Sequence, residues 1–372
     1  MNEELIARVG RHLRSWVTGR PVTGDVPGPE TATVVLEDSA CLDAVLGSDA
    51  VGPRTLVLAP GAPDGQDDRS GATVVGYEGS LSGSEGDASV GDVLFLQIQD
   101  YGVSPYMSLL GTTLVRVAGD TDFEMFLADA DAARTEGRFA PFAVSPAVQL
   151  ADLSALGGHV PEDGPGTRLY VNRDGSVSVS PQGLPLGTAG DSAAALRSAW
   201  ERLSAASEVG GAVPLGAAVA EELRGTAVRR RPWLARYLVT LDLLRDLQTR
   251  GITEPRVSGF GSRLVPGLEE VEGALDADDP RAPFLCWTPE KAYVRVPDPG
   301  RTFQLGRRAA AITEMLLVLG SVEAVEEYAG RHTGDAETGP VDRAAVERVL
   351  AFFADKGVSL VPGAAPLLEA TA

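Results

Sequence analysis

The hydrophobic period of this sequence changes at Gly306, from the two-residue repeat of strands to the 3.6-residue repeat of helices. Before Gly306, short runs rich in β-branched and aromatic residues predict three strands, at Phe284–Thr288, Ala292–Val296 and Thr302–Leu305. After it, apolar residues at helical spacing predict three helices, at Arg307–Leu319, Val322–His332 and Val341–Lys356. The end of the chain is therefore expected to form a small unit in which a three-stranded antiparallel sheet is followed by three helices.

Length and composition place the chain among globular proteins. Its 372 residues suffice for two or three domains, and 44% of them are hydrophobic. No apolar run approaches the roughly 20 residues of a bilayer span, and the charged first 17 residues do not resemble a signal peptide. Cys41 and Cys286 lie far apart in apolar contexts, so we expect two buried thiols in a cytoplasmic protein.

The charge of the chain is strongly negative and unevenly distributed. The formal net charge is −20, and residues 1–220 hold 13 basic and 29 acidic side chains. A field of this sign repels nucleic acid and anionic membranes. We therefore expect neither nucleic acid nor a membrane among the partners of this protein.

Residues 1–142 have the pattern of an α/β domain. An amphipathic helix is expected over Glu3–Val17. Strands are predicted at Thr33–Leu36, Thr55–Leu58, Thr73–Val75, Val93–Ile98 and Thr113–Val117, with helices at Ser39–Leu46 and Thr121–Arg134. This pattern predicts buried parallel strands flanked by helices, and we place the end of the domain near Phe142.

Residues 143–280 are expected to form a hairpin-and-helix middle segment. Leu169–Val171 and Val177–Val179 flank an Asp-Gly turn, which predicts a hairpin, and a helix over Asp191–Ala205 follows. This stretch resembles the SPASM segment of peptide-modifying radical enzymes, but serines stand where that family has a cysteine, so no iron–sulfur cluster is expected. The basic helical stretch from Arg224 to Arg250 predicts a salt-bridged helix or, alternatively, an interface with an acidic partner.

The sequence carries no recognisable catalytic motif. The glycine-rich stretch 76–91 lacks G-x-G-x-x-G spacing and the lysine of a P-loop, so we expect an acidic surface loop there. No G-x-S-x-G elbow occurs, and the three histidines, His12, His159 and His332, lack metal-ligand spacing. We therefore expect no catalytic residues, no metal and no cofactor.

The C-terminal unit, residues 281–362, resembles the RiPP recognition element, a winged-helix module that binds the leader region of ribosomally made precursor peptides. The small peptide chaperone of pyrroloquinoline quinone biosynthesis typifies that family. The resemblance rests on the order of elements and on matching positions: Leu305, Ala309–Ala311, Val322, Val325, Val346, Leu350 and Gly357. Gly306 departs from the pattern, because many members carry Asn there. Residues 363–372 form a tail outside this unit.

The resemblance implies where a peptide binds. In that family the leader adds as a further strand beside the third strand and lies against the third helix, a mode called β-augmentation. The receiving strand would comprise Arg301, Thr302, Phe303, Gln304 and Leu305, with Phe303 and Leu305 directed inward. The other wall would comprise Arg343, Glu347, Leu350, Ala351 and Ala354 of the last helix.

A DNA-binding winged helix is disfavoured by the charges of the last helix. Three acidic residues, Asp342, Glu347 and Asp355, balance three basic ones, Arg343, Arg348 and Lys356. A recognition helix needs a surplus of donors directed at base edges. Peptide binding is therefore the favoured interpretation of this unit.

The layout of the whole chain resembles the family of daptide-biosynthesis RiPP recognition proteins. That resemblance implies a non-catalytic adaptor, which presents a bound precursor peptide to an oxidoreductase and an aminotransferase. Two alternatives stay open. One is a degenerate partner subunit related to ThiF-like cyclodehydratase components, and the other is a cofactor-dependent enzyme whose site is assembled from scattered residues.

Overall fold

The structure, a computed structural model, describes residues 2–24, 28–83, 87–91, 93–271, 273–297, 300–332 and 341–361. The chain divides into two compact units. Unit 1 comprises residues 1–128 and 140–232, and unit 2 comprises residues 129–139 and 233–372. Within the part of the chain just given, no helix is both long enough and apolar enough to cross a membrane.

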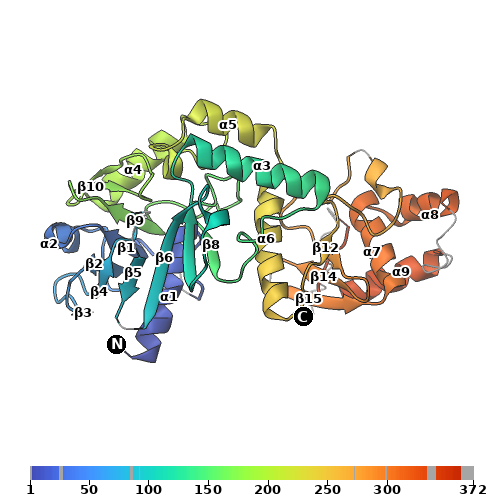
Figure 1. Ribbon diagram of the computed structural model, residues 1–372, viewed down its shortest axis with the longest axis horizontal. Coiled ribbons are helices and arrows are strands. Elements are labelled where there is room, and N and C mark those ends of the chain that lie inside the picture. The colour runs from blue at the N-terminus through green and yellow to red at the C-terminus, as the bar shows by residue number, and fades with distance from the viewer. Residues whose placement is uncertain are drawn as a thin grey trace, which may run out of the picture. The chain divides into compact units, whose positions relative to one another are not determined.

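Unit 1 is built on one large mixed sheet (Figure 1). Its strand order is β11-β10-β9-β1-β2-β4-β5-β6-β7-β8, and β3 pairs with β4 off this path. The strands are β1 Thr33–Leu36, β2 Leu56–Pro60, β3 Gly65–Gln66, β4 Thr73–Gly79, β5 Asp87–Val90, β6 Leu94–Asp100, β7 Thr112–Arg116, β8 Val148–Leu150, β9 Arg168–Val171, β10 Ser176–Ser178 and β11 Gly187–Thr188.

The strand directions confirm the expected parallel core and add antiparallel pairs to it. Strands β9, β1, β2 and β4 are parallel neighbours, as are β6, β7 and β8. Strand β5 is antiparallel to both β4 and β6. Part of the stretch 76–91 thus pairs within the sheet, because β4 continues to Gly79 and β5 begins at Asp87, and the expectation of a surface loop over this whole stretch was wrong.

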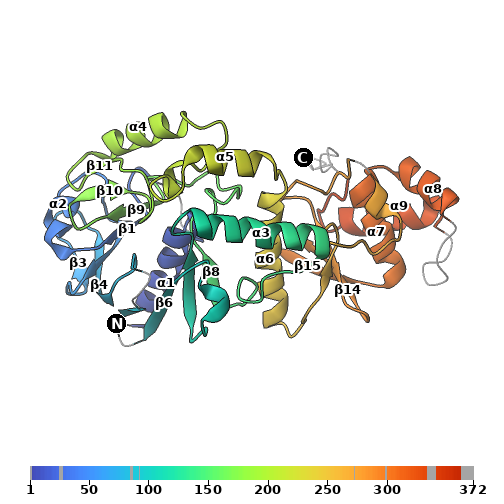
Figure 2. The same ribbon diagram turned by 45° about the horizontal axis from the view of Figure 1, so that its top comes forward.

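Helices cover both faces of the sheet in unit 1. They are α1 Glu3–Thr18, α2 Leu42–Leu46, the first turns of α3 Asp120–Glu136, α4 Ala193–Ser204 and α5 Glu221–Arg229. Successive residues of β1 point to opposite faces: Val34 and Leu36 share a core with Leu196 of α4, whereas Val35 shares a core with Trp16 of α1. Figure 2 shows α4 beside β10 and β11.

The boundary expected near Phe142 does not separate two units. The hairpin of β9 and β10 belongs to the N-terminal sheet, because β9 pairs in parallel with β1 from Thr33 opposite Arg168 to Leu36 opposite Val171. Residues 143–232 therefore belong to unit 1, and the hairpin expected in a separate middle segment lies in the same sheet as the N-terminal strands. The basic stretch 224–250 is also divided, because α5 ends before Pro232 and α6 Leu234–Thr249 begins after it.

Unit 2 combines α6 with an antiparallel sheet and three further helices. The expected order of elements at the C-terminus is observed: β13 Phe284–Trp287, β14 Ala292–Val296, β15 Arg301–Leu305, α7 Arg307–Leu319, α8 Val322–Arg331 and α9 Arg343–Ala354. The sheet has four strands in the order β12-β13-β14-β15, because β12 Arg256–Val257 pairs with β13. The expectation of three strands missed β12, which is only two residues long.

The core of unit 2 lies between this sheet and the three helices. Leu285 and Val294 from the sheet are buried in one cluster with Leu316 of α7, Val346 of α9 and Phe353 of α9. Burying each such side chain contributes about 1.5–3 kcal/mol. Because the strands give one face to this core, their side chains alternate between the core and the other face of the sheet.

Candidate functional site

Strand β15 forms one end of the four-stranded sheet (Figure 1). It pairs antiparallel with β14 along its whole length, from Leu305 opposite Ala292 to Arg301 opposite Val296. In the described part of the chain no strand pairs with its other side. An edge of this kind presents a row of unpaired backbone N–H and C=O groups to any extended chain that arrives there.

The side chains of β15 alternate as expected. Phe303 and Leu305 pack against the apolar core, and Gln304 is exposed. The hydroxyl of Thr302 accepts a hydrogen bond of 3.0 Å from Arg295 on β14. The strand is therefore fixed by its inward residues, and its outer edge has no partner among the described strands.

Helix α9 meets β15 through aromatic rings. The ring centroid of Phe303 lies 6.2 Å from that of Phe352 and 5.6 Å from that of Phe353, in edge-to-face geometry. Phe353 is fully buried, but Phe352 is 43% exposed. At the start of the strand, Arg301 donates a 2.6 Å hydrogen bond from Nη2 to the carbonyl oxygen of Lys356, just after α9. These contacts hold the end of α9 beside β15.

The expected wall on α9 lies on a different side of the helix. Arg343 donates to Glu323 and Glu326 of α8 at 2.8 and 2.9 Å and to Glu347 at 3.2 Å, and these carboxylates raise its pKa. Successive residues turn by about 100° around a helix, which places five residues on the side of Arg343: Arg343, Glu347, Leu350, Ala351 and Ala354. Phe352 lies about half a turn from Arg343, on the side of β15.

Sequence reasoning therefore missed Phe352 as the helix residue beside the strand. Leu350 packs partly against the core, and Ala351 and Ala354 are exposed on the side of α9 away from Phe303. Spacing shows which residues share a face of a helix, but not which neighbour that face meets. The one available signal was the pair Phe352-Phe353, because adjacent aromatic residues cannot both point into the same core.

The buried charges of unit 2 anchor the loop between β12 and β13. The carboxylate of Glu314 on α7 is fully buried and accepts hydrogen bonds from Ser258 Oγ at 2.5 Å and from the backbone N–H groups of Leu264 and Val265 at 2.8 and 2.6 Å. Burial raises its pKa. Arg263 forms an ion pair of 2.6 Å with buried Asp276 on the same loop. Each charge has partners, as a structural role requires.

A hollow of about 760 Å³ lies beside that loop, within unit 2. Its lining includes Arg134 and the glycines Gly259 and Gly261. Arg134 donates 2.7 Å to the carbonyl oxygen of Gly259 and lies 5.8 Å from the ring centroid of Phe260, and burial lowers its pKa. The guanidinium group therefore supports the loop backbone.

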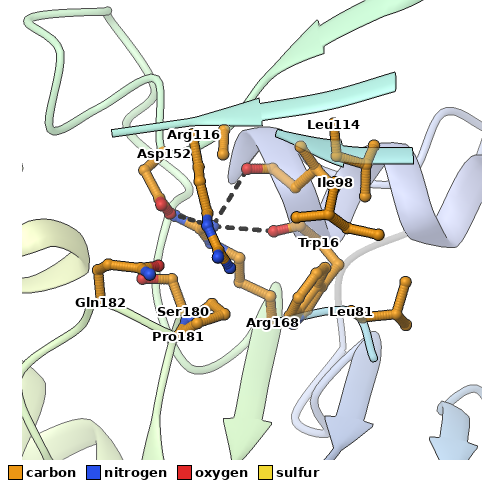
Figure 3. A pocket seen from close by; sticks show the side chains of 12 residues that line it. Trp16, Leu81, Ile98, Leu114, Arg116, Asp152, Arg168, Ser180, Pro181 and Gln182 are labelled. Carbon is orange, nitrogen blue, oxygen red and sulfur yellow. Dashed lines mark hydrogen bonds and ion pairs between the residues drawn. The ribbon is translucent and has the colours of Figure 1, made fainter. Parts of the chain in front are cut away.

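Unit 1 contains a small cavity around two arginines (Figure 3). Buried Arg168 forms ion pairs with Asp152 at 2.7 Å and Asp163 at 2.8 Å, and Arg116 pairs with Asp100 at 3.1 Å. Burial raises the pKa of Asp152 to about 6; Arg168 acts in the opposite direction, and the nearby carboxylate of Asp163 adds to the rise. The cavity volume of about 20 Å³ accommodates about one water molecule, so it is too small for a substrate.

The two cysteines, Cys41 and Cys286, differ in burial. Cys286 is buried, and burial raises the pKa of its thiol to about 12, which disfavours the nucleophilic thiolate. Cys41 is half-buried rather than buried, contrary to expectation. Among the residues that the structure describes, no three His, Cys, Asp or Glu side chains are arranged to hold a metal ion.

Comparison of the chain with protein-family models, with curated proteins and with solved structures gives no match in any of the three. Function must therefore be argued from the residues themselves. At the edge of β15, a strand side without a partner among the described strands lies beside the exposed ring of Phe352.

Proposed function

We propose that this protein is a non-catalytic adaptor that binds the leader region of a ribosomally made precursor peptide along β15. The observation that carries the proposal is the unpaired edge of β15 with the exposed ring of Phe352 next to it. The bound peptide would be presented to modifying enzymes, an oxidoreductase and an aminotransferase in a daptide-like pathway. The proposal places the protein in the cytoplasm, where precursor peptides are synthesised.

The proposal also assigns β13–β15 and α7–α9 to a winged-helix recognition element. Three antiparallel strands followed directly by three helices support that assignment. In this arrangement the peptide lies between the outer edge of β15 and the side of α9 that carries Phe352. This wall replaces the one expected at Arg343 and Glu347, which face α8.

Strand addition explains how such an edge yields both affinity and selectivity. Each backbone hydrogen bond to the peptide contributes a net of about 0.5–1.5 kcal/mol and is indifferent to sequence. Selectivity comes from alternate peptide side chains, which meet the groove wall. Phe352 suits an aliphatic or aromatic side chain, and burial of its exposed part stabilises the complex by the hydrophobic effect.

The charges beside this groove favour an acidic leader segment. Arg301 lies with its guanidinium carbon 5.8 Å from the ring centroid of Phe303, and Arg348 lies one helical turn before Phe352. Exposed cations at such a rim select carboxylates and accelerate association. We therefore expect a leader in which an apolar residue is flanked by Asp or Glu.

Binding of labelled precursor peptides to the full-length chain, measured by fluorescence polarisation, tests the proposal. Peptides are taken from precursor genes adjacent to the gene of this protein, with a scrambled leader as the control. We expect saturable binding that needs the leader and persists when the remainder of the precursor is removed. Equal binding of native and scrambled leaders, or no binding of either, would refute the adaptor function.

A further inference from the structure

A second exposed apolar surface lies on unit 1, on β6 and in the loop that follows it. Of eight large hydrophobic side chains found exposed among the described residues, six fall between Val93 and Leu110. Phe95 is 65% exposed, Tyr106 84% and Leu110 82%. The other three are about half exposed: Val93, Val103 and Met107. We call these six residues the β6 surface. Concentration of this kind marks an interaction site more often than scattered exposure does.

The β6 surface is held in place by hydrogen bonds of its own loop. Gln97 Oε1 accepts from the backbone N–H of Leu110 at 2.8 Å and from Thr113 Oγ1 at 3.1 Å. Gln99 Nε2 donates to the carbonyl oxygen of Ser108 at 3.4 Å. Because Phe95, Gln97 and Gln99 alternate onto one face of β6, these bonds bring the loop against the face that carries Phe95.

The charged side chains that the strand register places beside Phe95 and Gln97 are acidic. The strand register places Ser89 beside Phe95, Glu78 beside Ser89, and Asp87 beside Gln97, so both carboxylates share the face of Phe95. No Lys, Arg or His occurs between Arg69 and Arg116 in the sequence. Arg116 itself is buried and paired with Asp100. An apolar centre with an acidic rim complements a partner that presents apolar residues among lysines and arginines.

We propose that the β6 surface docks a basic, apolar helix or loop of a second protein. A second copy of this chain does not fit, because two molecules of net charge −20 repel each other. An anionic membrane is disfavoured by the same field. That the partner is one of the modifying enzymes rests on the proposed function, whereas the chemistry of the partner rests on the β6 surface alone.

The test uses the full-length chain and, as the probe, a labelled amphipathic peptide of leucine and lysine. We expect it to bind, and we expect the double variant Tyr106→Ser/Leu110→Ser to weaken binding about tenfold, because exposed apolar anchors dominate such interfaces. The variant Leu275→Ser, which removes a 47% exposed leucine from unit 2, should leave the affinity unchanged. A matched peptide of leucine and glutamate should bind the wild type at least about tenfold more weakly.

Three results would overturn this inference: equal affinity of the wild type and the double variant, equal binding of the lysine and glutamate peptides, or a dimer in sedimentation that the double variant dissociates. Binding of precursor peptides is measured on the same samples. If the precursor peptides do not bind but the lysine peptide still binds more tightly than the glutamate peptide, the proposed function is wrong and the docking surface is still supported. If the precursor peptides bind but the two probe peptides bind equally, only the docking surface is refuted.

Discussion

Phe352 exposes part of a large apolar ring to water, and covering that part with another molecule would be favourable. It is 43% exposed, and its ring meets Phe303 of β15. We expect Phe352→Ala to weaken binding of the precursor peptide about tenfold or more, as truncation of a central anchor does. The melting temperature should change little, because the neighbouring core residue Phe353 is untouched. Fluorescence polarisation and thermal denaturation of the full chain measure the two effects.

Two control variants show whether the effect is specific to the side of α9 that carries Phe352. Phe95→Ala removes an exposed phenylalanine from unit 1 and should leave peptide affinity unchanged. Ala351→Asp introduces a charge on the side of α9 that was first expected to line the groove. If Ala351→Asp weakens binding and Phe352→Ala does not, the peptide lies on the α8 side of the helix and the wall at Phe352 is wrong.

Asp152 gives the protein a pH dependence that a single substitution should remove. Its pKa in the folded protein is about 6, above the ordinary 3.8, so its protonated form stabilises the fold. That contribution is fully present below about pH 4 and is lost as the pH rises through about 6. We expect the free energy of unfolding of Asp152→Asn, relative to the wild type, to increase over this range, because Asn stays neutral.

Urea denaturation from pH 4 to pH 7 measures this difference. Asn suits the position, because residue 152 has φ of +54° and Asn tolerates the left-handed region. The variant Asp174→Asn provides the comparison, since hydrogen bonds from Ser176 lower the pKa of that carboxyl group instead. Parallel pH profiles of the wild type and Asp152→Asn would contradict the prediction, because they would show that the charged form of Asp152 does not destabilise the fold.

At the scale of elements, β15 makes a demand on the peptide backbone itself. An added strand directs alternate N–H groups toward its neighbour and the others away from it. We expect N-methylation of successive peptide residues to reduce affinity at every second position and to have little effect between them. Polarisation with a series of singly methylated peptides measures this. A uniform or aperiodic loss would mean that the peptide does not bind as a strand.

The elements themselves show what local patterning determines. The three strands and three helices of the C-terminal unit were predicted within a few residues, because each buries a face whose period is visible in the sequence. Five strands were missed, because runs of two to four residues are too short to show a period: β3, β5, β8, β11 and β12. The rotation of α9, and therefore the place of Phe352, depends on packing against Phe303, which lies 49 residues earlier in the chain.

At the scale of the whole molecule, long-range pairing sets the units, and sequence patterns do not reveal it. Strand β9 joins the N-terminal sheet by pairing with β1, more than 130 residues earlier in the chain. Unit 2 likewise takes in residues 129–139, where Phe139 stacks on Tyr237 of α6 at 6.2 Å. The boundaries expected at 142 and 281 marked changes in composition, and neither coincides with a division between the units.

We therefore expect a fragment of residues 281–372 to be unfolded, although its own elements were the clearest in the sequence. It lacks β12, which covers the edge of β13. It also lacks Ser258, Leu264 and Val265, which donate the three hydrogen bonds to buried Glu314. Hydrogen bonds to a charged group contribute about 1.5–3 kcal/mol each, so their loss removes roughly 5 kcal/mol or more, comparable with the whole stability of a small domain.

Circular dichroism and urea denaturation of two fragments measure this dependence. A fragment of residues 233–372 retains α6, β12 and the loop that satisfies Glu314, and we expect it to show cooperative unfolding. The variant Glu314→Gln in residues 281–372 separates the two causes, because a neutral amide is less costly to bury without partners than a carboxylate. Partial recovery of structure would assign the defect to the orphaned carboxylate. Cooperative folding of unmodified 281–372 would instead show that the three strands and three helices form an independent domain, and that the preceding loop only covers it.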